Sequence, residues 1–300
     1  MPVSATHSSV QFVHLTDPHL TGLDGRTPRW WELKRWLSYA SWQRKRRHRH
    51  LRERLDALVS AIDRTPPDAW AITGDLCQIG RPDEIAEAAD WLATLAPPDK
   101  VLLVPGNHDL FAHDSRSRLL AHWASWLHPQ PGAEPWPTEL VVGPVALIGV
   151  NSSVVTPPTR ATGRIGKSGL ARLTQALRRH RGRCRVVLVH HPVVPGSCAR
   201  RKALLDDREL CRVLESEGAA IALHGHLHHN AAWRIGGDDG TRVYCTGSAS
   251  AADRLGPAAA RRFTVHHTKD HGFSIEMELL ALDDSGHLSC QAREQWVCRG

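Results

Sequence analysis

The sequence lacks the cysteine spacing that builds a disulfide framework or a thiolate metal site. Its seven cysteines are scattered over 300 residues without a Cys-x-x-Cys pair. An odd number of unpatterned cysteines is typical of a protein that stays in a reducing compartment. The same scatter argues against a structural zinc site, since such sites use closely spaced thiolates.

Long apolar runs are also missing. No run reaches the roughly eighteen apolar residues of a membrane-spanning helix, so none is expected. Residues 1–9 have neither a basic nor an apolar segment, and we therefore expect no signal peptide. These absences predict a cytoplasmic protein, with peripheral contact at the inner face of the membrane as an open alternative. No repeat or clear linker interrupts the chain, which predicts a single domain over residues 1–300.

Five short apolar runs rich in β-branched residues are the main pattern present. They cover residues 10–16, 69–73, 101–105, 186–189 and 219–223. Runs of this length and composition predict buried strands. Helical patterns at about 51–62, 83–96, 168–180 and 206–217 lie between or beside them. The alternation predicts an α/β chain with ample residues for a core.

Each apolar run is followed by side chains that commonly bind metals. The set is Asp17, His19, Asp75, Asn107, His190, His226 and His228. Open α/β sheets place their sites at the carboxyl ends of the strands, so these side chains are expected to meet. Carboxylate, imidazole and amide ligands suit Mn, Fe, Zn or Co better than Ca or Mg. Seven ligands are too many for one ion with open positions and about right for two.

The motifs together resemble the calcineurin-like metallophosphoesterase superfamily over about residues 10–250. The matching motifs, which occur in the same order as in that family, are Asp17-x-His19, Gly74-Asp75, Gly106-Asn107-His108-Asp109, His190-x-Pro192 and Gly225-His226-x-His228. The resemblance implies an α/β (α+β) fold, a four-layer sandwich of two mixed β-sheets flanked by helices. It is specific because five motifs match together.

The resemblance also implies a role for each motif residue. Asp17, His19 and His228 match the ligands of one metal. Asn107, His190 and His226 match the ligands of the other, and Asp75 matches the bridge between them. His108 matches a catalytic histidine that contacts the phosphate and assists the leaving group. Asp109 either orients His108 or only closes a turn.

The implied mechanism is in-line attack on phosphorus by a hydroxide that bridges two divalent metals. The metals and His108 would neutralise the charge that grows on the phosphoryl oxygens. This predicts a metal-dependent phosphoric ester hydrolase whose partner is a small-molecule or lipid-linked phosphate ester. Histidines outside the motifs, such as His50, carry no prediction, because a lone histidine is more often structural than a ligand.

A tryptophan-rich and basic segment at about residues 28–54, called the insertion below, follows the first motif. Trp30, Leu33, Leu37 and Ala40 have helical spacing, and residues 44–50 are strongly basic. Three interpretations stay open: a helix packed on the domain, a lid that contacts substrate, or an interfacial membrane helix. Nucleic acid is not expected as a partner, because the aromatic and basic residues are segregated rather than interleaved.

A second basic segment leaves the fourth metal-bearing strand. Arg200, Arg201 and Lys202 are predicted to clamp a second phosphate or a carboxylate of the substrate; a solvated basic loop is the alternative. The chain is expected to close with a β-hairpin at about 273–300.

The first substrate prediction is a phosphodiester of the cyclic-nucleotide type. The alternative is a pyrophosphohydrolase of UDP-acyl-glucosamine in lipid A synthesis, suggested by the insertion, although the enzymes it resembles carry Gly-Asn-Arg-Asp where this chain has His108. A different class is a catalytically silent scaffold that binds a membrane or a protein. The net charge of +7 supports association with anionic partners without specifying the chemistry.

Overall fold

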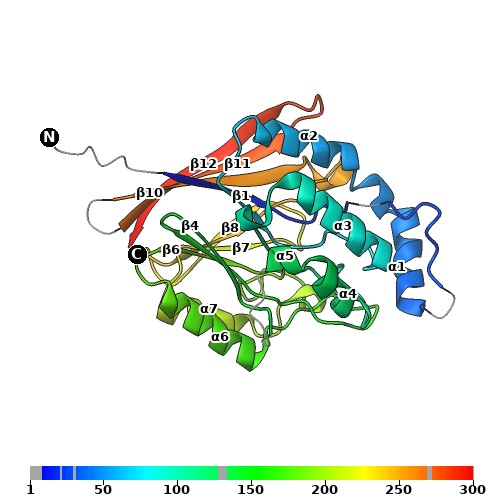
Figure 1. Ribbon diagram of the computed structural model, residues 1–300, viewed down its shortest axis with the longest axis horizontal. Coiled ribbons are helices and arrows are strands. Elements are labelled where there is room, and N and C mark those ends of the chain that lie inside the picture. Colours follow the sequence, from blue (N-terminus) through cyan, green and yellow to red (C-terminus); the bar gives the residue numbers. More distant parts are fainter. Residues whose placement is uncertain (1–8, 21, 30–31, 128–133, 269–271, 300) are drawn as a thin grey trace.

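Two six-stranded mixed sheets face each other in the computed structural model (Figure 1). The structure describes residues 9–20, 22–29, 32–127, 134–268 and 272–299. The first sheet has the order β12-β11-β10-β1-β2-β3. Its strands are β1 (Val10–Leu15), β2 (Ala69–Ile72), β3 (Val101–Leu103), β10 (Ala259–His267), β11 (Gly272–Leu282) and β12 (Leu288–Arg299).

The second sheet has the order β4-β5-β6-β7-β9-β8. Its strands are β4 (Thr138–Val142), β5 (Val145–Gly149), β6 (Cys184–Leu188), β7 (Ile221–His224), β8 (Ala231–Ile235) and β9 (Thr241–Cys245). The motif-bearing strands are parallel to their neighbours, β1 to β2 to β3 and β6 to β7. Their carboxyl ends therefore meet at one edge of each sheet, which is where the predicted ligands follow.

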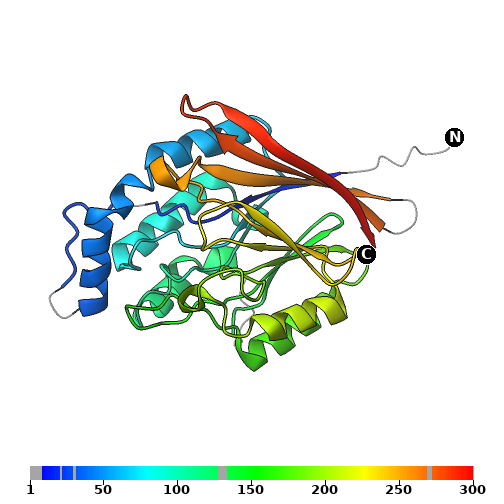
Figure 2. The same ribbon diagram turned by 180° about the vertical axis from the view of Figure 1, so that it is seen from behind.

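Helices cover the outer faces of both sheets. The helices are α1 (Leu33–Arg44), α2 (Arg52–Asp63), α3 (Pro82–Leu95), α4 (Ser115–His122), α5 (Ala124–Leu127), α6 (Gly166–Arg179) and α7 (Asp207–Glu217). Figures 1 and 2 show α6 and α7 below the second sheet, α2 and α3 on the side of the first sheet, and α1 projecting at one end. No helix in the described ranges is both long and apolar enough to span a bilayer.

Three buried clusters correspond to the three interfaces between the four layers. Leu55, Leu92 and Trp123 belong to the cluster that joins α2 to α5 with the first sheet. The cluster between the sheets contains Phe12, whose ring stacks on Phe263 of β10 at 4.9 Å between centroids. A third cluster joins α6 and α7 to the second sheet. The predicted four-layer sandwich of two mixed sheets is confirmed.

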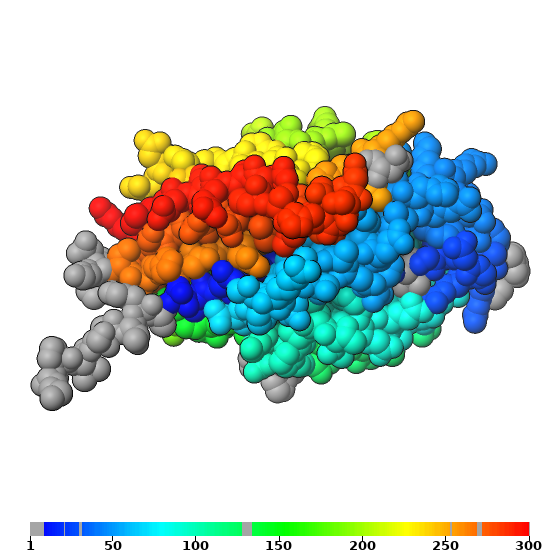
Figure 3. Space-filling view, turned by 90° about the horizontal axis from the view of Figure 1, so that it is seen from above, coloured from blue at the N-terminus to red at the C-terminus, as the bar shows by residue number. Residues whose placement is uncertain are grey.

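The C-terminal part of the chain is the least expected region. The predicted closing hairpin is present as β11 and β12, but sequence analysis did not identify β10, which pairs β11 with β1. Strand β10 begins with two alanines and two arginines, a composition with no clear alternation. Figure 3 shows β11 and β12 running across one face of the molecule, with α2 beside them.

The leucines that give α1 its helical spacing lie on its exposed face. Leu33 and Leu37 are 68% and 52% exposed, whereas Tyr39 and Trp42 are buried in a small cluster with Leu23, Ile79 and Phe111. Arg35 is buried on the same face because its guanidinium finds partners there. It donates to the carbonyl oxygen of Gly80 at 2.9 Å and pairs with Asp114 at 2.9 Å. Trp30, part of the same prediction, lies outside the described residues.

Candidate metal centre

The first motif is held in an unusual backbone conformation. Asp17 and His19 both have positive φ, at 50° and 42°. The backbone N–H of Asp17 donates to the carbonyl oxygen of Gly74, and that of His19 donates to the carbonyl oxygen of Asp75. The loop after β1 is thereby fastened to the loop after β2, which brings the two predicted carboxylates into one place.

The same conformation recurs in the other motifs. Asp75, His226 and His228 have φ values of 58°, 68° and 56°. These three and the two of the first motif are the non-glycine residues with positive φ in the described part of the chain. Each such conformation costs on the order of 1–3 kcal/mol, and such residues cluster at functional sites. The strain is therefore concentrated at five of the seven predicted ligands.

The motif glycines are required by close approach to the carboxylates. A Cβ on Gly106 would lie 2.1 Å from Oδ1 of Asp75, and a Cβ on Gly225 would lie 2.4 Å from Oδ2 of Asp17. Neither position has room for a side chain, so the loops after β3 and β7 can touch the carboxylates only because glycine stands there.

The structure brings the predicted ligands together in two groups. Ligand atoms of Asp17, His19, Asp75 and His228 lie within 4.8 Å of one another, and so do those of Asp75, His190 and His226. Asp75 belongs to both groups. Asn107 joins the second group, since its Oδ1 is 3.1 Å from Nε2 of His190. These seven residues are called the strand-end cluster below.

Backbone carbonyls orient two of the imidazoles. Nδ1 of His19 is 2.9 Å from the carbonyl oxygen of Cys77, and Nδ1 of His190 is 2.6 Å from that of Thr73. Each Nδ1 must carry a proton to make this bond. Nε2 of His19 therefore presents a lone pair to the cluster, whereas Nε2 of His190 lies 3.1 Å from Oδ1 of Asn107 and 3.3 Å from Oδ2 of Asp75. Metal-binding histidines commonly have this arrangement.

Two imidazole nitrogens of the cluster have no hydrogen-bond partner although they are buried. They are Nε2 of His19 and Nε2 of His226. A buried polar atom without a partner is costly, and such atoms are rare in folded proteins. A cation bound by these lone pairs would satisfy both, so the residues present fit the divalent metals that the motif resemblance implies.

Neighbouring charges in the cluster shift one another's pKa values. Burial by itself raises the pKa of Asp17, but His228, 3.0 Å away, lowers it to about 2. Burial likewise raises and His190 lowers the pKa of Asp75, which ends well below its usual range. Burial lowers the pKa of His190, but Asp75 raises it to about 9. The carboxylates are ionised at neutral pH and favour positive charge between them.

His108 lies at the mouth of the cluster with its ring 5.1 Å from that of His19. Its backbone N–H donates to Oδ1 of Asp75 at 2.7 Å, and its Nδ1 is 2.5 Å from the carbonyl oxygen of Gln78. Burial and the charge of Arg46 lower the pKa of His108 to about 3, against the attraction of Asp75. The imidazole is therefore neutral here, and its Nε2 lies 3.5 Å from Nη1 of Arg46.

Asp109 closes the turn and does not orient His108. Its carboxylate accepts hydrogen bonds from the backbone N–H groups of Asp75, Cys77 and Gly106, all at 2.8–2.9 Å. Of the two interpretations left open by the sequence, the structure favours the one in which Asp109 ties the loops after β2 and β3 together.

The insertion contributes two residues to the centre that sequence analysis missed. Arg46, in the 3-10 turn η1 (Arg46–His48), has Nη1 at 3.2 Å from Nδ1 of His108. Its Nη2 donates to the carbonyl and hydroxyl oxygens of Ser38 at 2.8 and 2.7 Å. His50 is buried with its ring 4.3 Å from that of His19. Neither follows a strand, so the pattern that found the other ligands could not find them.

A groove of about 440 Å³ opens beside His108 and Asn107. The insertion forms one wall of it, and the loops at 156–161 and 201–202 form the other. Its described lining includes five basic side chains and no carboxylate; the five are Lys34, Arg46, Arg160, Arg201 and Lys202. Two of the three predicted substrate-binding cations thus face the groove, while Arg200 lies outside the lining.

The chain is similar in sequence to known phosphoesterases. The model of the calcineurin-like phosphoesterase family matches residues 10–230. A glycerophosphodiester phosphodiesterase GpdQ of Enterobacter lignolyticus is 31% identical over 134 residues, 44% of each chain. A probable cyclic nucleotide phosphodiesterase of Rhodococcus erythropolis is 31% identical over 186 residues, 60% of this chain and 57% of that one. These matches span about half the length of the curated relatives.

The fold is shared with a solved structure of nearly equal extent. A dimetal phosphatase from Danio rerio superposes with a TM-score of 0.60 at 15% identity, covering 97% of this chain and 98% of the other. The likeness concerns the fold, and the family follows from the match over residues 10–230. The chain belongs to the calcineurin-like phosphoesterase family.

Proposed function

We propose that this protein is a metal-dependent phosphoester hydrolase with two cation positions. One position is formed by Asp17, His19 and His228, and the other by Asn107, His190 and His226. The observation that carries the proposal is the place of Asp75, which has ligand atoms within reach of both groups. A carboxylate has two oxygens and is suited to serve two cations.

The donor set decides which cations fit. Four imidazoles, two carboxylates and one amide oxygen favour Mn, Fe or Zn over the harder Ca and Mg. Bound in pairs at such sites, these ions lower the pKa of a shared water to give a nucleophile near neutral pH and neutralise charge on a phosphoryl group.

The chain's own residues would bind and orient the phosphate. His108 presents Nε2 at the mouth of the cluster, and Arg46 supplies a fixed positive charge beside it. Burial lowers the pKa of Arg46 to about 10, so the guanidinium stays charged at neutral pH. A bound phosphate would raise the pKa of His108 and let it donate a proton to the leaving oxygen.

A phosphodiester is the first substrate class. Both curated relatives reported above carry phosphodiesterase names, one of them for cyclic nucleotides. A small cyclic diester also fits a groove of about 440 Å³.

The groove also supports the alternative, a pyrophosphate-containing substrate such as UDP-acyl-glucosamine. A phosphodiester carries one negative charge, and two divalent cations already exceed it. Five further basic side chains in the lining therefore favour a substrate with negative groups beyond the scissile phosphate. Leu37 lines the same groove and is half exposed, which would suit an acyl chain.

The test is hydrolysis by the purified protein with Mn²⁺, compared with Asp75→Ala. The substrates are a chromogenic phosphodiester, a chromogenic monoester, cyclic AMP and a UDP-acyl-glucosamine. We expect turnover that falls at least about 10²–10³-fold in the variant, the range for loss of a charge-stabilising group. The fastest natural substrate decides between the two classes. A protein that binds no metal and turns over none of them would instead be a scaffold.

A further inference from the structure

Backbone pairing fastens His50 to residues 250–252. The backbone N–H of Leu51 donates to the carbonyl oxygen of Ser250 at 2.9 Å, and that of Ala252 donates to the carbonyl oxygen of Arg49 at 3.0 Å. These bonds form an antiparallel bridge between His50 and Ala251. The backbone of His50 is therefore held in place although it comes from the insertion.

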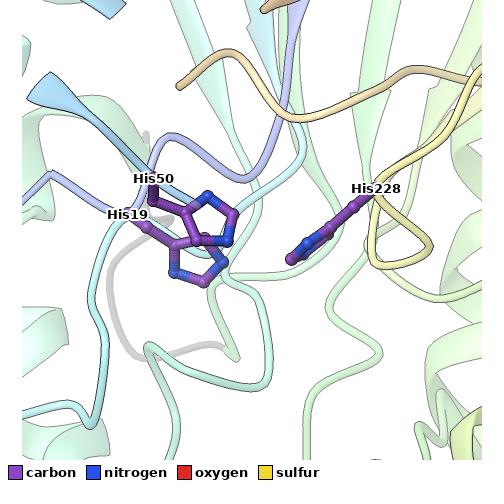
Figure 4. A group of neighbouring side chains, drawn as sticks. All are labelled: His19, His50 and His228. Atoms are coloured by element: carbon purple, nitrogen blue, oxygen red, sulfur yellow. The ribbon is translucent and has the colours of Figure 1, made fainter. Parts of the chain in front are cut away.

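The imidazole of His50 stands beside two residues assigned above to one cation. Ligand atoms of His19, His50 and His228 all lie within 4.8 Å of one another. The ring of His50 is 4.3 Å from that of His19 and 5.0 Å from that of His228, measured between centroids. Figure 4 shows His50 next to His19, with His228 facing both from the opposite side of the same space.

The hydrogen bonds of Ser248 favour one tautomer of His50. The hydroxyl of Ser248 donates to the carbonyl oxygen of Asp17 at 2.6 Å, so its proton is used there. Its oxygen, 3.2 Å from Nδ1 of His50, can accept from that nitrogen, whereas the hydroxyl of Ser250, 3.1 Å from the same nitrogen, can either donate or accept. Both serines are satisfied by the tautomer that carries its proton on Nδ1 and leaves a lone pair on Nε2.

His19 has the same arrangement. In both residues Nδ1 lies within hydrogen-bond distance of an oxygen, which leaves Nε2 as the ligand atom. A neutral imidazole oriented by a neighbouring acceptor is the usual form of a metal-binding histidine.

We propose that His50 is an additional ligand for the cation at the Asp17, His19 and His228 position. The ligand atom of His50 is grouped with those of His19 and His228 and is not within 4.8 Å of those of Asp17 and Asp75, so binding the same cation requires its imidazole to move closer to the carboxylates. The inference rests on the proposed function, because it presumes that this position holds a cation. An added nitrogen ligand would favour Fe, Co or Zn over Mg at that position.

The test is Co²⁺ binding to the metal-depleted protein, followed by calorimetry and by visible absorption. The variants are His50→Ala and, as a matched control, His48→Ala, an exposed histidine two residues away. We expect the wild type and the control to bind two Co²⁺ ions. In His50→Ala one of the two affinities should fall roughly 10–100-fold, the range for perturbed metal-site histidines. The absorption band of that ion should change, and free imidazole should restore it.

Two results are distinguished by this design. Two Co²⁺ ions bound by His50→Ala with unchanged affinities and spectrum would overturn the role of His50 and leave the proposed function standing. No Co²⁺ bound by the wild type would overturn the proposed function itself. His50→Gln keeps polar contacts near Ser248 and Ser250; if His50→Ala does not fold, the same comparison of affinity and spectrum is made with it.

Discussion

The strand-end cluster and the insertion build opposite sides of the same centre by different means. In the strand-end cluster, positions follow from backbone: β1, β2 and β3 are in parallel register, and glycines at 106 and 225 allow loops to touch carboxylates. In the insertion, buried Trp42 and Arg35 anchor a peripheral helix, and a single bridge between His50 and Ala251 fixes the backbone at the end of the segment. The first side is fixed by the sheets of the core, and the second is fixed by contacts of a segment that lies outside both sheets.

The largest effect is expected when the metal is removed from the strand-end cluster. A chelator should abolish hydrolysis, and Mn²⁺ should restore it, because the metals would supply the nucleophile and neutralise the charge on the phosphoryl group. Metal at 100 times its dissociation constant should also stabilise the fold by about 2.7 kcal/mol. Thermal unfolding with and without Mn²⁺ measures this stabilisation. Full activity after exhaustive dialysis against chelator would contradict the predicted dependence of hydrolysis on metal.

The second-largest effect on activity is expected for Gly106→Ala. The new Cβ would lie 2.1 Å from Oδ1 of Asp75, so the loop or the carboxylate must move. A displacement of about 1 Å at a reacting centre can cost about 10²-fold in rate, and overpacking costs about 1–3 kcal/mol of stability. Steady-state kinetics and denaturant unfolding measure both.

Gly237→Ala is the control for that variant, because a Cβ at Gly237 meets nothing within 4 Å. If Gly106→Ala kept wild-type kinetics, the close approach would not be what positions Asp75.

On the insertion side, Arg46→Met should lower kcat without emptying the metal positions. A lost hydrogen bond to a charged group costs about 1.5–3 kcal/mol, or roughly 10–100-fold in rate. Steady-state kinetics and the metal content of the same variant are measured together. A lower kcat with unchanged metal content would separate the role of the insertion from that of the strand-end cluster. Arg47→Met, at an exposed neighbouring position, is the control. Loss of bound metal in Arg46→Met would mean that the insertion supports the cluster as a whole.

The smallest effect is expected at the rim of the groove. Arg201→Ala should raise KM roughly fivefold for a substrate with a second phosphate. This change corresponds to the loss of about 1 kcal/mol of binding free energy, the value of a favourable exposed ion pair. It should leave a monoanionic diester unaffected. Arg200→Ala, outside the groove lining, provides the comparison. Equal changes for both substrates would remove the argument that these cations select a polyanion.

The two sides also differ in what the sequence could predict. Asp17, His19 and His226 follow buried strands, and parallel pairing brings strand ends together whatever the rest of the chain does. The sequence therefore predicted that such residues meet, whereas the sandwich that carries them was implied by the resemblance of the motifs to a known family. It did not predict β10, because two alanines and two arginines at its start obscure the alternation that a strand should have.

The contribution of the insertion depends on tertiary contacts that local pattern does not contain. The helical spacing of Leu33 and Leu37 indicated the face that is in fact exposed, because ion pairs make Arg35 a buried residue. His50 joins the cluster through pairing with residues 200 positions away in the chain. Only the folded chain shows such a contact.

The positive φ angles at five predicted ligands have a consequence for how this protein can evolve. Left-handed backbone is nearly free of cost for glycine and strained for aspartate and histidine. At these five positions the residue that best serves folding differs from the one that serves chemistry. Selection for thermal stability alone would therefore tend to replace the ligands themselves, and only simultaneous selection for turnover can retain them.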